Sequence, residues 1–132
     1  MKEAVQAALA AIVERYGAEQ VRAVPDGQGG AWIEISGIDL SDTYTQVTTF
    51  AIVLLPFNLP NADVYPMSVR ADLTRSDGTA LGEGFSATSL SWPGEAQPRA
   101  VTQVSRRTRR SDFTRQTPLQ KVEKVIEWIR TR

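Results

Sequence analysis

The stretch Tyr44-Thr45-Gln46-Val47-Thr48-Thr49-Phe50-Ala51-Ile52-Val53-Leu54-Leu55 decides the fold of this chain. Aromatic and β-branched residues dominate it, and these residue types favour extended backbone. Its second half is almost continuously apolar, which is typical of a strand covered on both faces. We therefore expect a buried strand that ends at Leu55.

The chain after this strand first breaks and then extends again. Pro56 and Pro60 cannot donate hydrogen bonds to a sheet, and the Asn and Asp residues that lie between 56 and 63 favour local turns. Residues 64–73 then alternate between apolar and polar side chains, which predicts another strand. Pro66 suits the entrance of that strand.

The chain before residue 44 predicts a helix and a hairpin. The larger apolar side chains of residues 2–16 recur at helical spacing, and Gly17 is suited to end such a helix. Residues 20–25 and 31–35 alternate as strands do, and the loop between them holds three glycines. This arrangement predicts two antiparallel strands joined by a loop.

The last third of the chain predicts a long loop and a second helix. Residues 81–98 are rich in Gly and Pro, so we expect an irregular segment pinned by Phe85, Leu90 and Trp92, serving either a function or as a cover over the core. Thr117-Pro118-Leu119-Gln120 predicts a helix start with a capping box. An apolar stripe at helical spacing follows.

Together these elements predict an α+β domain, with helices on one face of an antiparallel meander of three or four strands. The length of 132 residues suits one domain, residues 1–132. No apolar run approaches the roughly 20 residues that cross a bilayer, so we expect a soluble, cytoplasmic protein with no membrane contact. The oligomeric state stays open.

The chain contains no Cys and no His. Disulfides, thiolate nucleophiles, imidazole bases and zinc sites built from sulfur or imidazole are therefore excluded. Asp39 with Asp42, or Asp72 with Asp77, would have to supply any acid–base or metal chemistry, but acids at such spacing are ordinarily solvated surface. We expect no catalytic residue, no metal and no cofactor, and keep an enzyme based on carboxylates and hydroxyls as an alternative.

The net charge of zero hides an asymmetry along the chain. Residues 1–96 hold five basic and twelve acidic side chains, whereas residues 97–132 hold ten basic and three acidic ones. The basic part includes Arg106, Arg107, Arg109 and Arg110, whose guanidinium groups can bind phosphate or carboxylate. These arginines can pair with acids of this chain such as Asp63 and Asp72, or bind an acidic protein. A nucleic acid bound by segment 105–115 is a further alternative, although the acidic remainder of the chain disfavours it.

A series of short motifs follows the strand that ends at Leu55. The motifs are Leu55-Pro56, Pro60, Asp63, Tyr65-Pro66, Asp77-Gly78, Trp92 and Ser105-Arg106-Arg107. In this order they resemble ubiquitin-conjugating-enzyme-like (UBC-like) domains, and in particular a bacterial branch that lacks the active-site cysteine. The resemblance covers roughly residues 44–130. It implies an N-terminal helix, a four-stranded antiparallel meander, an irregular flap and a C-terminal helix.

The same resemblance carries an expectation about function. Conjugating enzymes hold a ubiquitin-like protein as a thioester on a Cys after the flap, and residues 80–100 of this chain contain neither Cys nor His. The resemblance therefore implies an inactive homologue that serves as an adaptor. Its implied partners are a ubiquitin-like protein, an activating-enzyme-like protein or a JAB-type peptidase. We take Arg106, Arg107, Arg109, Arg110 and Trp92 as the candidate partner-binding residues.

Overall fold

The computed structural model describes residues 1–132, apart from the side chain of Ser111. It is an α+β fold with two long helices, a one-turn helix and one six-stranded antiparallel sheet. The elements are α1 (Glu3–Tyr16), β1 (Val21–Pro25), β2 (Ala31–Asp39), β3 (Thr48–Leu55), β4 (Met67–Arg70), β5 (Phe85–Leu90), β6 (Arg99–Val104), α2 (Arg110–Phe113) and α3 (Pro118–Arg130).

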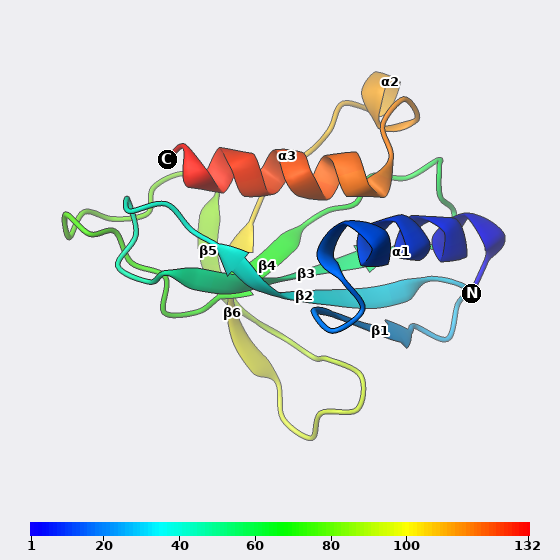
Figure 1. Ribbon diagram of the computed structural model, residues 1–132, viewed down its shortest axis with the longest axis horizontal. Helices are drawn as coiled ribbons and strands as arrows, with labels where there is room; N and C mark the ends of the chain where they lie inside the picture. The colour runs from blue at the N-terminus through cyan, green and yellow to red at the C-terminus, as the bar shows by residue number, and fades with distance from the viewer.

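The strands lie side by side in the order β1-β2-β3-β4-β6-β5. The first four are therefore neighbours in chain order, and the predicted hairpin of β1 and β2 is confirmed. Beyond β4 the order reverses, because β6 lies between β4 and β5. Helices α1 and α3 both cover one face of the sheet, and the connection from β5 to β6 lies on the other side (Figure 1).

The predicted count of three or four strands was too low. Segment 81–98, predicted to be an irregular loop, contains β5, and the unassigned residues 99–104 form β6. Strand β5 escaped prediction because it is the last strand of the sheet and its four middle residues, Ser86 to Ser89, are all exposed. An edge strand with little to bury lacks the apolar alternation by which strands are recognised.

Both predicted helices are present, with the predicted ends. Gly17 ends α1 with φ at +94°, a backbone conformation that residues other than glycine disfavour. Thr117 and Gln120 form the capping box of α3, in which each side chain accepts from the other residue's backbone N–H. In the described part of the chain, no helix is long and apolar enough to span a membrane.

The core lies between the helices and the sheet. Alternate residues of β3 face the helices, where Ala51, Val53 and Leu55 are buried with residues of α1 and α3. Tyr44 lies just before β3, and its hydroxyl donates to the backbone oxygen of Ile129 over 2.7 Å. Ile52 faces the opposite side of the sheet and is also buried, so the prediction that β3 is covered on both faces is confirmed.

Candidate functional site: a basic groove beside α3

Helix α3 carries one buried cation, Lys121, which is only 4% exposed. Its Nζ lies 3.0 Å from Oδ1 of Asp63 and donates to the backbone oxygen of Arg106 over 2.7 Å and to Oγ1 of Thr108 over 2.5 Å. A buried ammonium group requires such partners, because its desolvation is costly. Lys121 thus connects two stretches of chain to α3: the proline-rich segment (residues 56–66) and the residues that follow β6.

Asp63 also binds the chain after β6 directly. Its second carboxylate oxygen accepts the backbone N–H of Thr108 over 2.8 Å. Thr108 also accepts from the amide of Gln116 over 2.9 Å. The backbone of residues 105–110, which we call the arginine segment, is therefore fixed at Arg106 and Thr108 by contacts that leave the arginine side chains outside.

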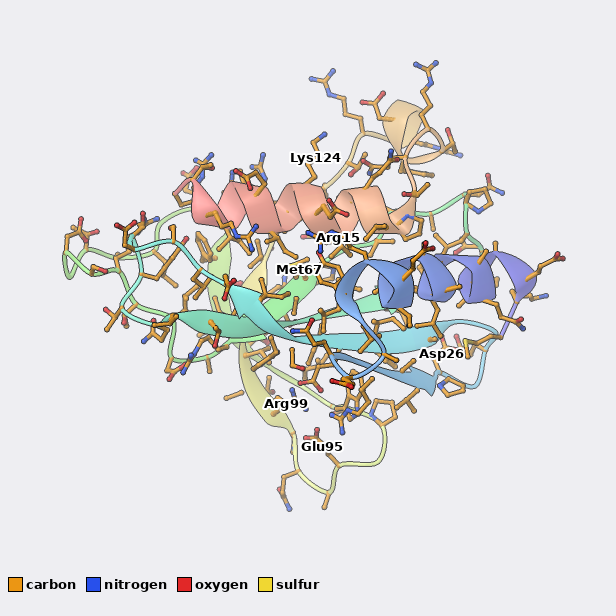
Figure 2. The ribbon with its side chains drawn as sticks, viewed as in Figure 1. Arg15, Asp26, Met67, Glu95, Arg99 and Lys124 are labelled. Atoms are coloured by element: carbon orange, nitrogen blue, oxygen red, sulfur yellow. The ribbon has the colours of Figure 1, made fainter. Side chains whose placement is uncertain are left out.

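A hollow of about 270 Å³ opens between the arginine segment and α3. We call it the basic groove. Its lining residues are Arg106, Arg107, Thr108, Arg109, Asp112, Lys121, Lys124, Val125 and Trp128. Lys124 is exposed and projects from α3 away from the sheet (Figure 2). The lining thus combines several cations with one carboxylate, that of Asp112, and one aromatic side chain.

Trp128 is that aromatic side chain, and cations lie against it. The guanidinium carbons of Arg106 and Arg132 each lie 4.6 Å from the centre of its ring system. Phe85 of β5 stacks on Trp128, with ring centres 5.2 Å apart. Cation–π contacts hold a guanidinium in place and leave its N–H groups able to bind an anion.

Arg107 is held in a similar way by Tyr65, with its guanidinium carbon 4.3 Å from the ring centre. Tyr65 belongs to the proline-rich motif, so that motif contacts the arginine segment directly.

The internal pairing considered for the arginines is not formed with the expected acids. Asp63 pairs with Lys121, and Asp72 pairs with Arg70 over 2.6 Å. Among the residues that the structure describes, the side chains of Arg106, Arg107, Arg109 and Arg110 form no ion pair.

Trp92, the other candidate partner-binding residue, lies far from this groove in the fold. It is 2% exposed and belongs to the β5–β6 connection (residues 91–98), on the sheet face opposite the helices. The guanidinium carbons of Arg22 and Arg99 lie 4.7 Å and 5.9 Å from its ring centre. The structure therefore assigns Trp92 to packing and does not bring it to the arginine segment.

Two carboxylates neutralise the arginines around Trp92. Glu34 lies 2.7 Å from Arg22 and 2.9 Å from Arg99, and Glu95 lies 2.5 Å from Arg99. Figure 2 shows Glu95 and Arg99 together on this side of the sheet. Burial by itself raises the pKa of Glu34, but the hydrogen bonds from Arg99 and Arg22 outweigh it, so the pKa lies below its ordinary value.

The remaining candidates form no site among the described residues. No three acidic side chains come together as a metal-binding group there. Asp72 is paired with Arg70, and Asp77 accepts from the hydroxyl and backbone N–H of Thr79. Of the motif residues, Leu55 ends β3, Pro56 and Pro60 lie in or beside the turn after it, and Pro66 lies directly before β4, as expected for a strand entrance. None of them supplies a charged group.

Sequence reasoning missed Lys121, which organises the groove. One signal was available, because Lys121 lies four residues before Val125 and three after Pro118, beside the apolar stripe of α3. A lysine at such a position either extends to solvent or requires a buried acid.

Comparisons of the chain with protein-family models, with curated proteins and with solved structures found no match.

Proposed function

We propose that this chain is a non-catalytic UBC-like binding module, an adaptor in a bacterial ubiquitin-like modification system in the cytoplasm, and that its basic groove binds an acidic surface of a partner protein. The observation that carries the proposal is the state of the arginine segment. The guanidinium groups of Arg106 and Arg107 are positioned by Trp128 and Tyr65, and neither forms an ion pair with a described residue, although Asp112 lines the same groove.

The arrangement of elements supports the UBC-like part of the proposal. An N-terminal helix precedes four antiparallel strands in chain order, a proline-rich turn follows the third of them, and a helix follows the arginine segment. Strands β5 and β6 have no counterpart in the four-stranded meander that the resemblance implies. This support is an analogy at the level of fold.

The adaptor part of the proposal rests on side-chain chemistry. A thioester needs a thiol, and the chain has none, so it would act beside an enzyme that supplies one. The partner classes that we propose are a ubiquitin-like protein, an activating-enzyme-like protein and a JAB-type peptidase. Opposite charges across an interface accelerate association and select among partners.

The test is co-purification of the tagged chain from its native host, followed by mutation of the groove. We expect capture of a protein from one of these classes, and we expect Arg106→Ala with Arg107→Ala to abolish capture. The matched control is Lys2→Ala with Arg15→Ala, which removes two exposed cations on α1 or at its start. Failure to capture such a partner, or equal loss in both double variants, would contradict the proposal.

A nucleic-acid ligand is the second candidate, since arginines stacked on aromatic rings also bind phosphates and bases. A gel shift with labelled RNA and DNA at two salt concentrations separates the two functions. Binding that falls steeply with salt and depends on Arg106 and Arg107 would replace the protein partner by a nucleic acid.

A further inference from the structure

Strand β5 is an open edge of the sheet, and its free backbone groups can be assigned. Phe85 lies opposite Val104, and the N–H of Ser105 donates to the oxygen of Gly84 over 2.8 Å. In an antiparallel pair, alternate residues direct their N–H and C=O groups to the neighbouring strand. Gly84, Ser86 and Thr88 therefore face β6, and Phe85, Ala87 and Ser89 direct their backbone groups away from the sheet.

The two edges of the sheet differ in how they are protected. Strand β1 carries Pro25 and the ion-paired Arg22, and proteins commonly use proline and charged side chains to prevent further pairing at an edge. Strand β5 has neither a proline nor a charged residue, and its register with β6 is unbroken over six residues. It is the edge at which another strand can be added.

The side chains around β5 indicate which charge an added strand should carry. Phe85 stacks on Trp128, and Arg106 and Arg132 lie on the same ring system. Glu83 precedes the strand, but the two guanidinium groups outnumber it. A carboxylate on an added strand, opposite Phe85 and on the helix side, would lie next to these cations.

We propose that β5 takes an extended acidic segment of a partner protein as a seventh strand, held by the backbone groups of Phe85, Ala87 and Ser89 and by Arg106 and Arg132. Strand addition of this kind draws affinity from the backbone and specificity from alternate side chains. The inference rests on the proposed function, because it specifies how the acidic partner binds.

A second copy of the chain is the less suitable occupant. A two-fold pairing of β5 with itself, centred on Ala87, satisfies the same backbone groups. It also brings a second pair of Arg106 and Arg132 to the same side of the joined sheet, without supplying a negative charge. An acidic segment satisfies the backbone groups and the arginines together.

The probe is a fluorescent, end-blocked octapeptide of alternating Glu and Val, and fluorescence anisotropy measures its affinity. We expect it to bind, and a Lys and Val octapeptide not to bind. Ala87→Pro removes an outward N–H that β6 does not use, and prolines are tolerated at such edge positions. It should weaken binding about tenfold. Ala87→Thr keeps the N–H and should change affinity less than about twofold.

Hydrogen exchange of the wild-type chain provides a readout that depends on no variant. The peptide should protect the backbone amides of Phe85, Ala87 and Ser89, measured by nuclear magnetic resonance. Absence of binding, or protection that omits these amides, would overturn the proposal. A concentration-dependent dimer that Ala87→Pro dissociates would overturn it in favour of self-pairing.

The partner capture described above separates this inference from the function on which it rests. If Ala87→Pro leaves capture intact while Arg106→Ala with Arg107→Ala abolishes it, strand addition fails and the binding module stands. If Arg106→Ala with Arg107→Ala and the control Lys2→Ala with Arg15→Ala reduce capture equally, the proposed function fails first.

Discussion

Arginines occupy two regions of this molecule, and the two regions treat them differently. On the sheet face opposite the helices, Arg22 and Arg99 bind Glu34 and Glu95 and lie over the buried Trp92. At the basic groove, Arg106 lies over a tryptophan as well, but none of the described residues provides it with an ion pair.

The difference teaches which arginines are used to build the fold. Arg22 and Arg99 link β1, β2 and the β5–β6 connection. Their charges are neutralised within the molecule, by Glu34 and Glu95. The groove instead obtains its rigidity from Lys121, which binds Asp63 and the backbone of the arginine segment. The guanidinium groups of that segment therefore retain their capacity for an external carboxylate or phosphate.

Lys121→Ala should have the largest effect on the free energy of unfolding, because Lys121 holds the basic groove in place. The change leaves Asp63 with its charge but without its ammonium partner in a largely buried place, which typically costs about 3–5 kcal/mol. We expect the free energy of unfolding to fall by this amount in urea titrations. The arginine segment should lose its amide protection at Thr108, which donates to Asp63.

The control combines Lys121→Met with Asp63→Asn, because this pair carries no buried charge and the Asn oxygen can still accept from Thr108. We expect it to recover more than half of the lost stability. A single variant as stable as the wild type would show that the groove is not held by Lys121.

Glu34→Gln should have an intermediate effect on stability, and it should also change how stability depends on pH in the acid range. Because the folded-state pKa of Glu34 lies below its ordinary value of 4.5, its ion pairs stabilise the protein above that pH. This contribution is lost as the pH falls through the folded-state pKa. Glu34→Gln should lower the free energy of unfolding at neutral pH by about 1–3 kcal/mol.

Thermal unfolding followed from pH 7 to pH 2 checks this prediction. Glu34→Gln should flatten the acid side of the wild-type profile, whereas Glu14→Gln, at an exposed position of α1, is the comparison variant away from the network. Parallel wild-type and Glu34→Gln profiles would mean that these ion pairs do not stabilise the fold.

The smallest effect on stability should come from the groove arginines. Arg106→Ala with Arg107→Ala removes exposed side chains and two cation–π contacts, so we expect a change of about 1 kcal/mol or less. Arg99→Ala, which leaves Glu34 with one partner fewer, is the contrasting variant and should cost more. Denaturant unfolding of both proteins compares them directly, and a larger loss at the groove would reverse the contrast between the two regions.

The sequence allowed prediction of the parts of the fold that bury an apolar stripe. Helix α3 was predicted from the capping residues Thr117 and Gln120 and from the helical spacing of its apolar side chains. Strand β3 was predicted from its continuous apolar run. Strand β5 could not be predicted in this way, because Ser86 to Ser89 remain exposed at the edge. Its extended backbone depends on β6, a neighbour that follows it in the chain.

The site was predictable in composition but not in arrangement. The clustered arginines were visible in the sequence, whereas the distinction between Trp92, which is buried, and Trp128, which lines the groove, depends on the three-dimensional packing. The pairing of Lys121 with Asp63 joins residues 58 positions apart. Such a contact depends on how α3 packs against the chain between β3 and β4, which the spacing of apolar side chains does not specify.

The position of β6 has a consequence for how the protein is made. Strand β4 is registered with β3 at one residue pair but with β6 at four, and β5 pairs with β6 alone. Because a ribosome releases the chain from its N-terminus, β4 and β5 emerge before the strand that completes both. Helix α1 and strands β1, β2 and β3 have local partners early, whereas this end of the sheet must wait for residues 99–104 to complete it during translation.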